Sequence, residues 1–157
     1  MTRATGRAGP VLAVDLGTRR IGLALSDHSR RLASPWRVLG CSGSAEHDRA
    51  AIIRAVEESR ATVVVVGVPI SLDGTRGPAA RQALEEVECL RMPLEQRGIG
   101  LETADERLTT VTAEAALEAS GRRGRDRRQV VDAAAAAVLL QAWLDSAGFQ
   151  REPGSPC

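Results

Sequence analysis

Three carboxylates stand in this sequence beside residues that belong in a protein interior. Asp15 ends an unbroken apolar run at residues 11–14, Glu106 comes just after an expected strand at 99–104, and Asp132 precedes five consecutive alanines. Burying a carboxylate is costly unless something offsets its charge. A bound metal ion or a phosphate-handling site would supply that offset, so these residues are the first candidates for chemistry.

The expected strand order brings two of these acids to one edge of a sheet. Unbroken apolar runs suit parallel strands covered on both faces, and the strand–helix alternation after residue 44 predicts such a sheet. The carboxyl ends of parallel strands share an edge, beyond which ligands bind. Asp15 and one of Asp105 and Glu106, which point to opposite faces, would meet there. Gly67 has no side chain and would let them approach across the strand between them.

Asp132 is expected on the inward face of the last helix. At helical spacing it falls in line with Ala135, Ala136, Leu139 and Trp143, a stripe that has to pack on the sheet. Three carboxylates that converge without His or Cys suit Mg²⁺ or Mn²⁺. Two such ions bridged by carboxylates are a common device for phosphodiester hydrolysis, so we expect a two-ion site.

Each acid also has an interpretation that involves no ligand. Asp15 could accept hydrogen bonds from the turn at Gly17. The acids at positions 105–106 could pair with Arg107, and Asp132 could complement the dipole in the first turn of its helix.

A dense cationic segment, residues 121–128, stands just before Asp132. It holds five arginines against one aspartate and is expected to form a mobile loop. The arginine fork matches phosphate well, so nucleic acid is the natural target, with a solvated charge run as the alternative. Aromatic residues are 2% of the chain, which argues against base stacking. The candidate nucleic-acid contacts are Arg19, Arg20, Arg107, Arg122, Arg123, Arg125, Arg127 and Arg128.

The hydrophobic pattern predicts an α/β fold with a five-stranded mixed sheet and helices on both faces. Three strands joined by short connections form an antiparallel meander, and two further strands add in parallel. The expected strands are 11–15, 20–26, 32–39 (an edge strand, because it contains Pro35), 62–67 and 99–104. The expected helices are 45–60 capped by Ser44, 77–91 ended by Pro93, a helix from Thr109 or Thr110 to 119, and 128–147.

Length and composition predict one domain over residues 10–147 with flexible tails at 1–9 and 148–157. The chain has no apolar run near 18 residues and no signal-peptide pattern, so we expect a cytoplasmic protein. Its three cysteines lack C-x-x-C spacing and are expected to be free thiols, and its two histidines lack the spacing of zinc ligands.

The acidic and glycine-containing segments together resemble the YqgF family, also called RuvX, the Holliday junction resolvase or pre-16S rRNA nuclease family. The resembling segments are 15–22 (DLGTRRIG), 67–69 (GVP), 73–74 (DG), 105–110 (DERLTT) and 132–136 (DAAAA), in family order. The resemblance implies a ribonuclease H-like fold and a bacterial cytoplasmic enzyme that trims the 5′ end of the 16S rRNA precursor. It also assigns the acidic roles to Asp15, Glu106 and Asp132.

Departures from the family pattern are few: Arg19 replaces a usual Lys, Ser71 replaces a usual Asn, and Pro93 interrupts the second long helix. The leading expectation is a metal-dependent endonuclease acting on pre-rRNA, with branched DNA as the alternative substrate. A non-catalytic nucleic-acid-binding module is a further alternative. A phosphotransferase of the actin and sugar-kinase type shares Asp-x-Gly-x-Thr at 15–18, but it needs two such domains.

Nucleic acid is therefore the expected partner, with the small ribosomal subunit as a further one and no membrane. Cutting both strands of a DNA junction would require a symmetric dimer. An enzyme that trims RNA could act as a monomer, and the sequence leaves both states open.

Overall fold

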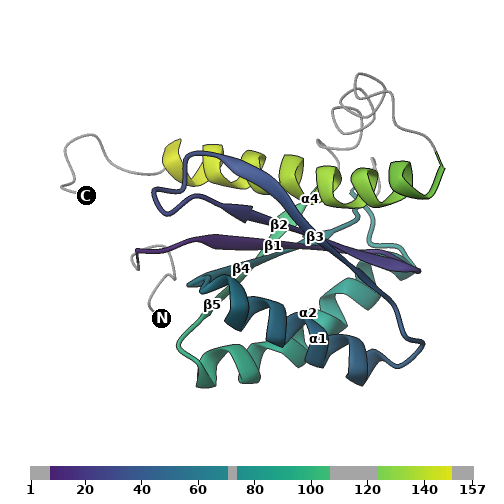
Figure 1. Ribbon diagram of the computed structural model, residues 1–157. Helices are drawn as coiled ribbons and strands as arrows, with labels where there is room; N and C mark the ends of the chain where they lie inside the picture. Colours follow the sequence, from purple (N-terminus) through teal and green to yellow (C-terminus); the bar gives the residue numbers. More distant parts are fainter. Residues whose placement is uncertain (1–7, 71–73, 107–123, 150–157) are drawn as a thin grey trace.

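The computed structural model describes residues 8–70, 74–106 and 124–149, and within the last range the side chains of residues 131–146. One sheet has the strand order β3-β2-β1-β4-β5 (Figure 1). The strands are β1 (Val11–Leu16), β2 (Arg20–Ser26), β3 (Ala33–Gly40), β4 (Val63–Val68) and β5 (Gly100–Asp105). The helices described are α1 (Ala45–Ser59), α2 (Pro78–Gln96) and α4 (Gly124–Phe149).

Strand pairing follows the predicted topology. β1 pairs antiparallel with β2, and β2 pairs antiparallel with β3, which forms the meander. β4 pairs parallel with β1, and β5 pairs parallel with β4. The edge strand β3 has its register shift beside Pro35, where a residue without an N–H does least harm.

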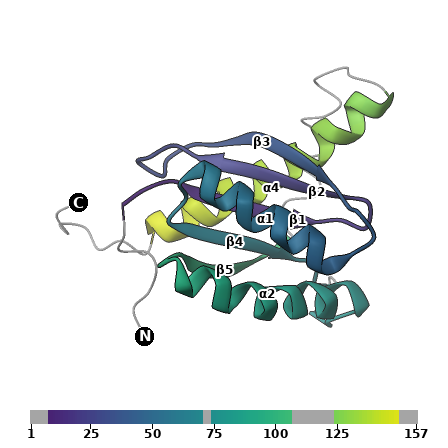
Figure 2. The ribbon, with the colours of Figure 1, turned by 60° about the horizontal axis from the view of Figure 1, so that its bottom comes forward.

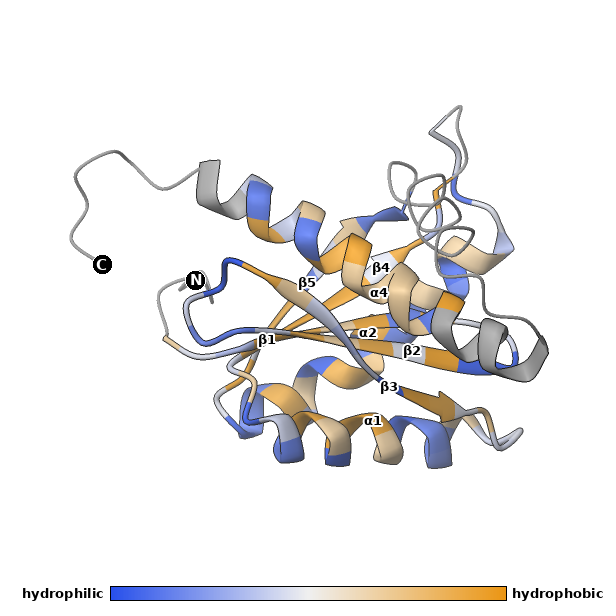
Figure 3. Ribbon diagram, turned by 45° about the horizontal axis from the view of Figure 1, so that its top comes forward, coloured by the Kyte–Doolittle hydropathy of each residue, from blue (hydrophilic) through white to orange (hydrophobic). Residues whose placement is uncertain are grey.

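The sheet lies between two helical layers, with α1 and α2 on one face and α4 on the other (Figures 1 and 2). Successive residues of a strand face opposite ways, so β1 contributes to both layers. Leu12 and Val14 pack toward α1 and α2, whereas Val11 and Ala13 pack toward α4. Hydrophobic residues accordingly line the central strands (Figure 3). All four of these β1 side chains have no exposed surface.

The first helix forms where its cap predicts. The Ser44 side chain accepts a hydrogen bond from the His47 amide at 3.2 Å, which satisfies one of the donors left free at a helix start. Ile52 and Val56 bury the inner face. The helix ends at Ser59, one residue earlier than predicted. The next residue, Arg60, caps it with a left-handed backbone conformation, φ 58°.

The predicted end of the second helix near Met92 is wrong. α2 passes through Pro93 and ends at Gln96. Leu90 and Leu94, both without exposed surface, fix the last turns against the sheet. That burial offsets the one backbone hydrogen bond that proline removes.

The last helix begins earlier than predicted. Residues 124–128, expected in a mobile loop, form the first turns of α4, since arginine is a good helix former. The helix also extends to Phe149 rather than 147. The predicted helix at 110–119 lies outside the described residues. Within the described part of the chain, no helix is both long and apolar enough to span a membrane.

α4 lies unusually close to the sheet. Ala133, Ala136 and Ala137 are buried at its inner face, where small side chains keep the backbones near each other. A Cβ added at Gly22 of β2 would stand 2.1 Å from the carbonyl oxygen of Asp132. Further along the helix, Gln141 accepts a hydrogen bond from the Ala33 amide at 2.9 Å and donates one to the Arg31 carbonyl at 3.0 Å.

Gly22→Ala should therefore destabilise the protein by pushing α4 from the sheet. Because the contact atom belongs to the helix backbone, we expect a loss of about 1–3 kcal/mol in the free energy of unfolding, as for other overpacked interiors. Urea denaturation measures it. Gly40→Ala is the matched control, because a Cβ at Gly40 meets nothing within 4 Å. Equal stability of the two variants would contradict this account of the helix–sheet contact.

Candidate active site

Asp15 and Glu106 lie on the α4 face of the sheet, at the carboxyl ends of β1 and β5. Val14 pairs with Val66, so Asp15 is level with the next residue of β4, Gly67. Gly67 pairs with Ala104, and Glu106 follows two residues later on the same face. Strand parity thus directs both carboxyl groups to the space above Gly67.

Gly67 provides that space. A Cβ added there would stand 2.3 Å from Oε1 of Glu106 and 2.8 Å from Cδ2 of Leu139. The Glu106 carboxyl therefore lies directly over the β4 backbone, with the buried Leu139 of α4 beside it. The approach of two acids across a strand that lacks a side chain, expected from the sequence, is present in the structure.

Glu106 holds a proton beside Asp15. Burial raises the pKa of Glu106 to about 9, and a side-chain hydrogen bond with Asp15 and the negative charges of Asp15 and Asp105 add to the effect. Protonated Glu106 donates to the Asp15 carboxyl group, because two carboxylates in contact repel each other.

Asp105 and Glu106 take different faces of the sheet. Asp105 is the last residue of β5 and pairs with Val68, which places it on the opposite face from Gly67. The negative charge of Asp105 raises the pKa of Glu106, although Asp105 is not part of the hydrogen bond between Glu106 and Asp15. Of these two acids, Glu106 is therefore the one on the same face as Asp15. The sequence pattern alone did not distinguish them, and only the family resemblance indicated Glu106.

Asp132 comes from α4 and contacts a cation. Its Oδ2 accepts a hydrogen bond from Nε of Arg20 at 2.5 Å, and the two side chains are 28% and 29% exposed. Its backbone carbonyl lies over Gly22, the register partner of Asp15. Among the described side chains, no three carboxylate, imidazole or thiol groups gather closely enough to hold a metal ion. The backbone of the third acid is thus adjacent to the pair, while its carboxylate turns to Arg20.

Two of the alternatives without a ligand do not hold. The amide of Gly17 donates to the Arg20 carbonyl at 3.0 Å. This bond closes the β1–β2 turn, so the Gly17 amide is not donated to Asp15. Asp132 stands well inside α4, which begins at Gly124, and is too far from the helix start to complement its dipole. Arg107, the third alternative, lies outside the described residues.

The predicted nucleic-acid contacts are only partly described. Arg19 is exposed in the β1–β2 turn, and Arg20 pairs with Asp132. Arg122 and Arg123 lie outside the described residues, as does Arg107. The backbone at Arg125, Arg127 and Arg128 is in the first turns of α4, which start the helix that carries Asp132.

Sequence reasoning missed the bond between Arg20 and Asp132. The signal was present in the strand period: Arg20 and Gly22 stand two apart on β2, so they share the α4 face. An arginine on the sheet face that an inward-pointing acid contacts can serve as its counter-ion. The charge of Arg20 had instead indicated a contact with phosphate.

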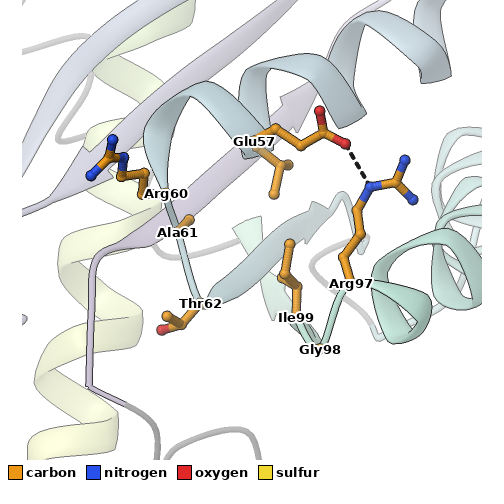
Figure 4. A pocket seen from close by; sticks show the side chains of 8 residues that line it. Glu57, Arg60, Ala61, Thr62, Arg97, Gly98 and Ile99 are labelled. Carbon is orange, nitrogen blue, oxygen red and sulfur yellow. Dashed lines mark hydrogen bonds and ion pairs between the residues drawn. The ribbon is translucent and has the colours of Figure 1, made fainter.

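A cavity of about 280 Å³ lies elsewhere, where β4 and β5 begin. Its lining includes Arg60, Thr62 and Ile99, and its acid, Glu57, accepts a hydrogen bond from Arg97 at 2.6 Å (Figure 4). Because the parallel strands run away from this end, the cavity is at the opposite edge of the sheet from Asp15 and Glu106. It does not contribute to the acidic site.

The fold is that of the resolvase-type, ribonuclease H-like proteins. The T. thermophilus RuvC structure in complex with Holliday junction substrate matches with a TM-score of 0.57 and 16% identity, covering 89% of this chain and 96% of that chain. The fowlpox virus resolvase complex with Holliday junction DNA matches with a TM-score of 0.57 and 9% identity, covering 87% and 97%.

The chain belongs to the RuvX family, whose model, described as Holliday junction resolvase, matches residues 9–146. A relative from Anaeromyxobacter dehalogenans strain 2CP-C, named "Putative pre-16S rRNA nuclease", is 46% identical over 134 residues, covering 85% of this chain and 95% of the relative. A relative of the same name from Kineococcus radiotolerans is 42% identical over 148 residues, covering 94% and 78%.

The proton on Glu106 makes the stability of the metal-free protein depend on pH. Its pKa is about 9 in the fold and 4.5 for an ordinary glutamate, so the native state binds the proton more tightly than the unfolded chain. The resulting stabilisation is complete below pH 4.5 and is lost as pH rises toward 9, by at most about 1.4 kcal/mol per pH unit. Glu106→Gln, which stays neutral, should therefore gain stability relative to the wild type as pH rises.

Urea unfolding in EDTA between pH 5 and 9 measures this difference. Glu102→Gln is the control, since Glu102 lies on the same face of β5 four residues earlier and is also half-buried. A difference between wild type and Glu106→Gln that stays constant over this range would show that Glu106 ionises normally.

Proposed function

We propose that this chain is a metal-dependent endonuclease that hydrolyses phosphodiester bonds near the 5′ end of the 16S rRNA precursor. The observation that carries the proposal is the Asp15–Glu106 pair above Gly67, with the backbone of Asp132 one strand away. The names of the relatives support a nuclease that acts on pre-16S rRNA. Such work belongs to ribosome maturation in the bacterial cytoplasm, with the small subunit as a partner.

The donor set fits a hard divalent cation. Asp15 and Glu106 present carboxyl oxygens only, and Glu106, whose pKa is raised by burial and by Asp15, holds a proton that a divalent cation would replace. Mg²⁺ and Mn²⁺ prefer such oxygen ligands. Asp15 and Glu106 would hold the ion, and Asp132, whose backbone lies over the register partner of Asp15, is the candidate for a further ligand.

The chain's own residues position the site. Gly67 leaves the space that Glu106 occupies, and Leu139 borders that space on the α4 side. One or two Mg²⁺ or Mn²⁺ ions bound there would supply an activated water and offset the charge of the leaving oxygen. Arg19, exposed beside the end of β1, would contact a neighbouring phosphate, and the arginines of residues 122–128 would extend that contact.

Branched DNA is the second candidate substrate. The description of the family model favours it, because that description names a Holliday junction resolvase. The same carboxylate chemistry would cut either nucleic acid. Cutting a junction requires two sites related by symmetry, whereas trimming an RNA leader requires one.

Cleavage of two labelled substrates tests the proposal: a 16S precursor 5′-leader RNA and a four-way DNA junction, each with Mn²⁺, Mg²⁺ or EDTA. We expect metal-dependent cutting of the RNA. Asp15→Asn should lower the rate by at least about 100-fold, since even outer partners of metal sites typically contribute 10- to 100-fold. Asp105→Asn, on the opposite face, should cut normally.

Each other outcome has a definite meaning. Symmetric junction cutting without RNA cutting would make the DNA candidate correct. Activity retained in Asp15→Asn would overturn the acidic site. Binding of both substrates without cutting of either would favour the non-catalytic module.

The arginine-rich segment should set the salt dependence of nucleic-acid binding. Replacing the five arginines of residues 121–128 with alanine leaves fewer phosphates neutralised, so affinity should fall. The slope of log K against log salt should become shallower by up to about 0.7 for each phosphate of single-stranded RNA that the variant no longer neutralises. Fluorescence anisotropy from 50 to 300 mM salt measures it. Arg54→Ala combined with Arg81→Ala, at exposed positions on α1 and α2, is the control. An unchanged slope would favour a solvated charge run instead.

A further inference from the structure

Asp132 and Arg20 form an ion pair at the position where the acidic site needs a third ligand. The Nε–Oδ2 distance is 2.5 Å, and about a quarter to a third of each side chain is exposed (29% and 28%). The two residues come from adjacent layers: Arg20 from the start of β2 in the sheet, and Asp132 from α4 packed on it. The pair therefore joins the helix to the sheet beside Asp15.

Strand register shows how near the other acids are. Gly22 pairs with Asp15, and the carbonyl group of Asp132 lies on Gly22. Arg20 stands two residues before Gly22 on the same face, beyond the end of β1. The backbone of Asp132 thus lies beside the register partner of Asp15, while its carboxylate contacts Arg20. A change of rotamer would carry that carboxylate away from Arg20 without moving the backbone.

We propose that Arg20 is a positioning residue that holds Asp132 while no metal is bound and releases it to a divalent cation bound by Asp15 and Glu106. This inference rests on the proposed nuclease function, because it concerns the same acidic site. Arg20 is the counter-ion of the metal-free protein, and the cation takes its place when it binds.

Charge explains why such an exchange suits this site. Without a cation, the carboxylate of Asp132 is mostly buried beside other acidic residues, and the guanidinium of Arg20 offsets its charge. A partly exposed ion pair is weak, so a divalent ion can outcompete it. Arg20 therefore stabilises the metal-free fold and lowers the affinity for metal.

Metal affinity in a double-mutant cycle tests this directly. Mn²⁺ binding is measured by electron paramagnetic resonance for wild type, Arg20→Gln, Asp132→Ala and the double variant. Removing the competitor should tighten Mn²⁺ binding two- to tenfold in Arg20→Gln. The same change should have no effect in the Asp132→Ala background, because there is no carboxylate left to release.

Arg19→Gln is the matched control. It removes one positive charge from the neighbouring, exposed position and should leave the affinity within twofold of wild type. If Arg20→Gln tightened binding equally with and without Asp132, the effect would be one of net charge and the proposal would be wrong. Weaker Mn²⁺ binding by Arg20→Gln would also overturn it.

Thermal unfolding in EDTA tests the metal-free half of the proposal. Arg20→Gln should lower the melting temperature, and most of that decrease should vanish in Asp132→Ala. Without such coupling, Arg20 does not hold Asp132, and the proposal fails while the nuclease function stands. If wild type and Asp15→Asn bind Mn²⁺ equally weakly, the metal site itself fails, and this inference fails with it.

Discussion

The structure depends on how closely one helix can approach the sheet. α4 brings Asp132 and Leu139 to the same face that receives Asp15 and Glu106, and it can do so only because Gly22 and Gly67 leave room. Alanines at the inner face of α4 serve the same purpose from the helix side. Small residues on both layers thus make a helix–sheet contact in which the backbone of Asp132 lies beside the Asp15–Glu106 pair.

Negative charge is the cost of that arrangement, and the metal-free structure balances it in two ways. Glu106 keeps a proton against Asp15, and Asp132 binds Arg20. Both devices are reversible, which distinguishes them from burial of an apolar side chain. Under the proposed function, a site built in this way is stable without an ion and would still accept one. Its acids would then serve folding and catalysis in different charge states.

Much of this could be predicted from the sequence, because strand parity and periodic burial are local properties. The meander, the parallel strands and the meeting of two acids over Gly67 all follow from period-two patterns. The end of α2 did not follow, because tertiary burial of Leu94 outweighed the local effect of Pro93. The Arg20–Asp132 pair was missed for a related reason: it joins residues 112 positions apart, and no local pattern reports on that.

Gln141 adds a restriction on chain length. It binds the backbone at Ala33 and Arg31, while Asp132, nine residues earlier (141 − 132), binds Arg20 from the other side of the helix. The two anchors are about 13.5 Å apart along the axis, and one inserted residue would rotate one anchor by about 100° relative to the other. The number of residues in α4 between Asp132 and Gln141 is therefore fixed. Changes of length are accommodated only outside this stretch, in the connections between elements.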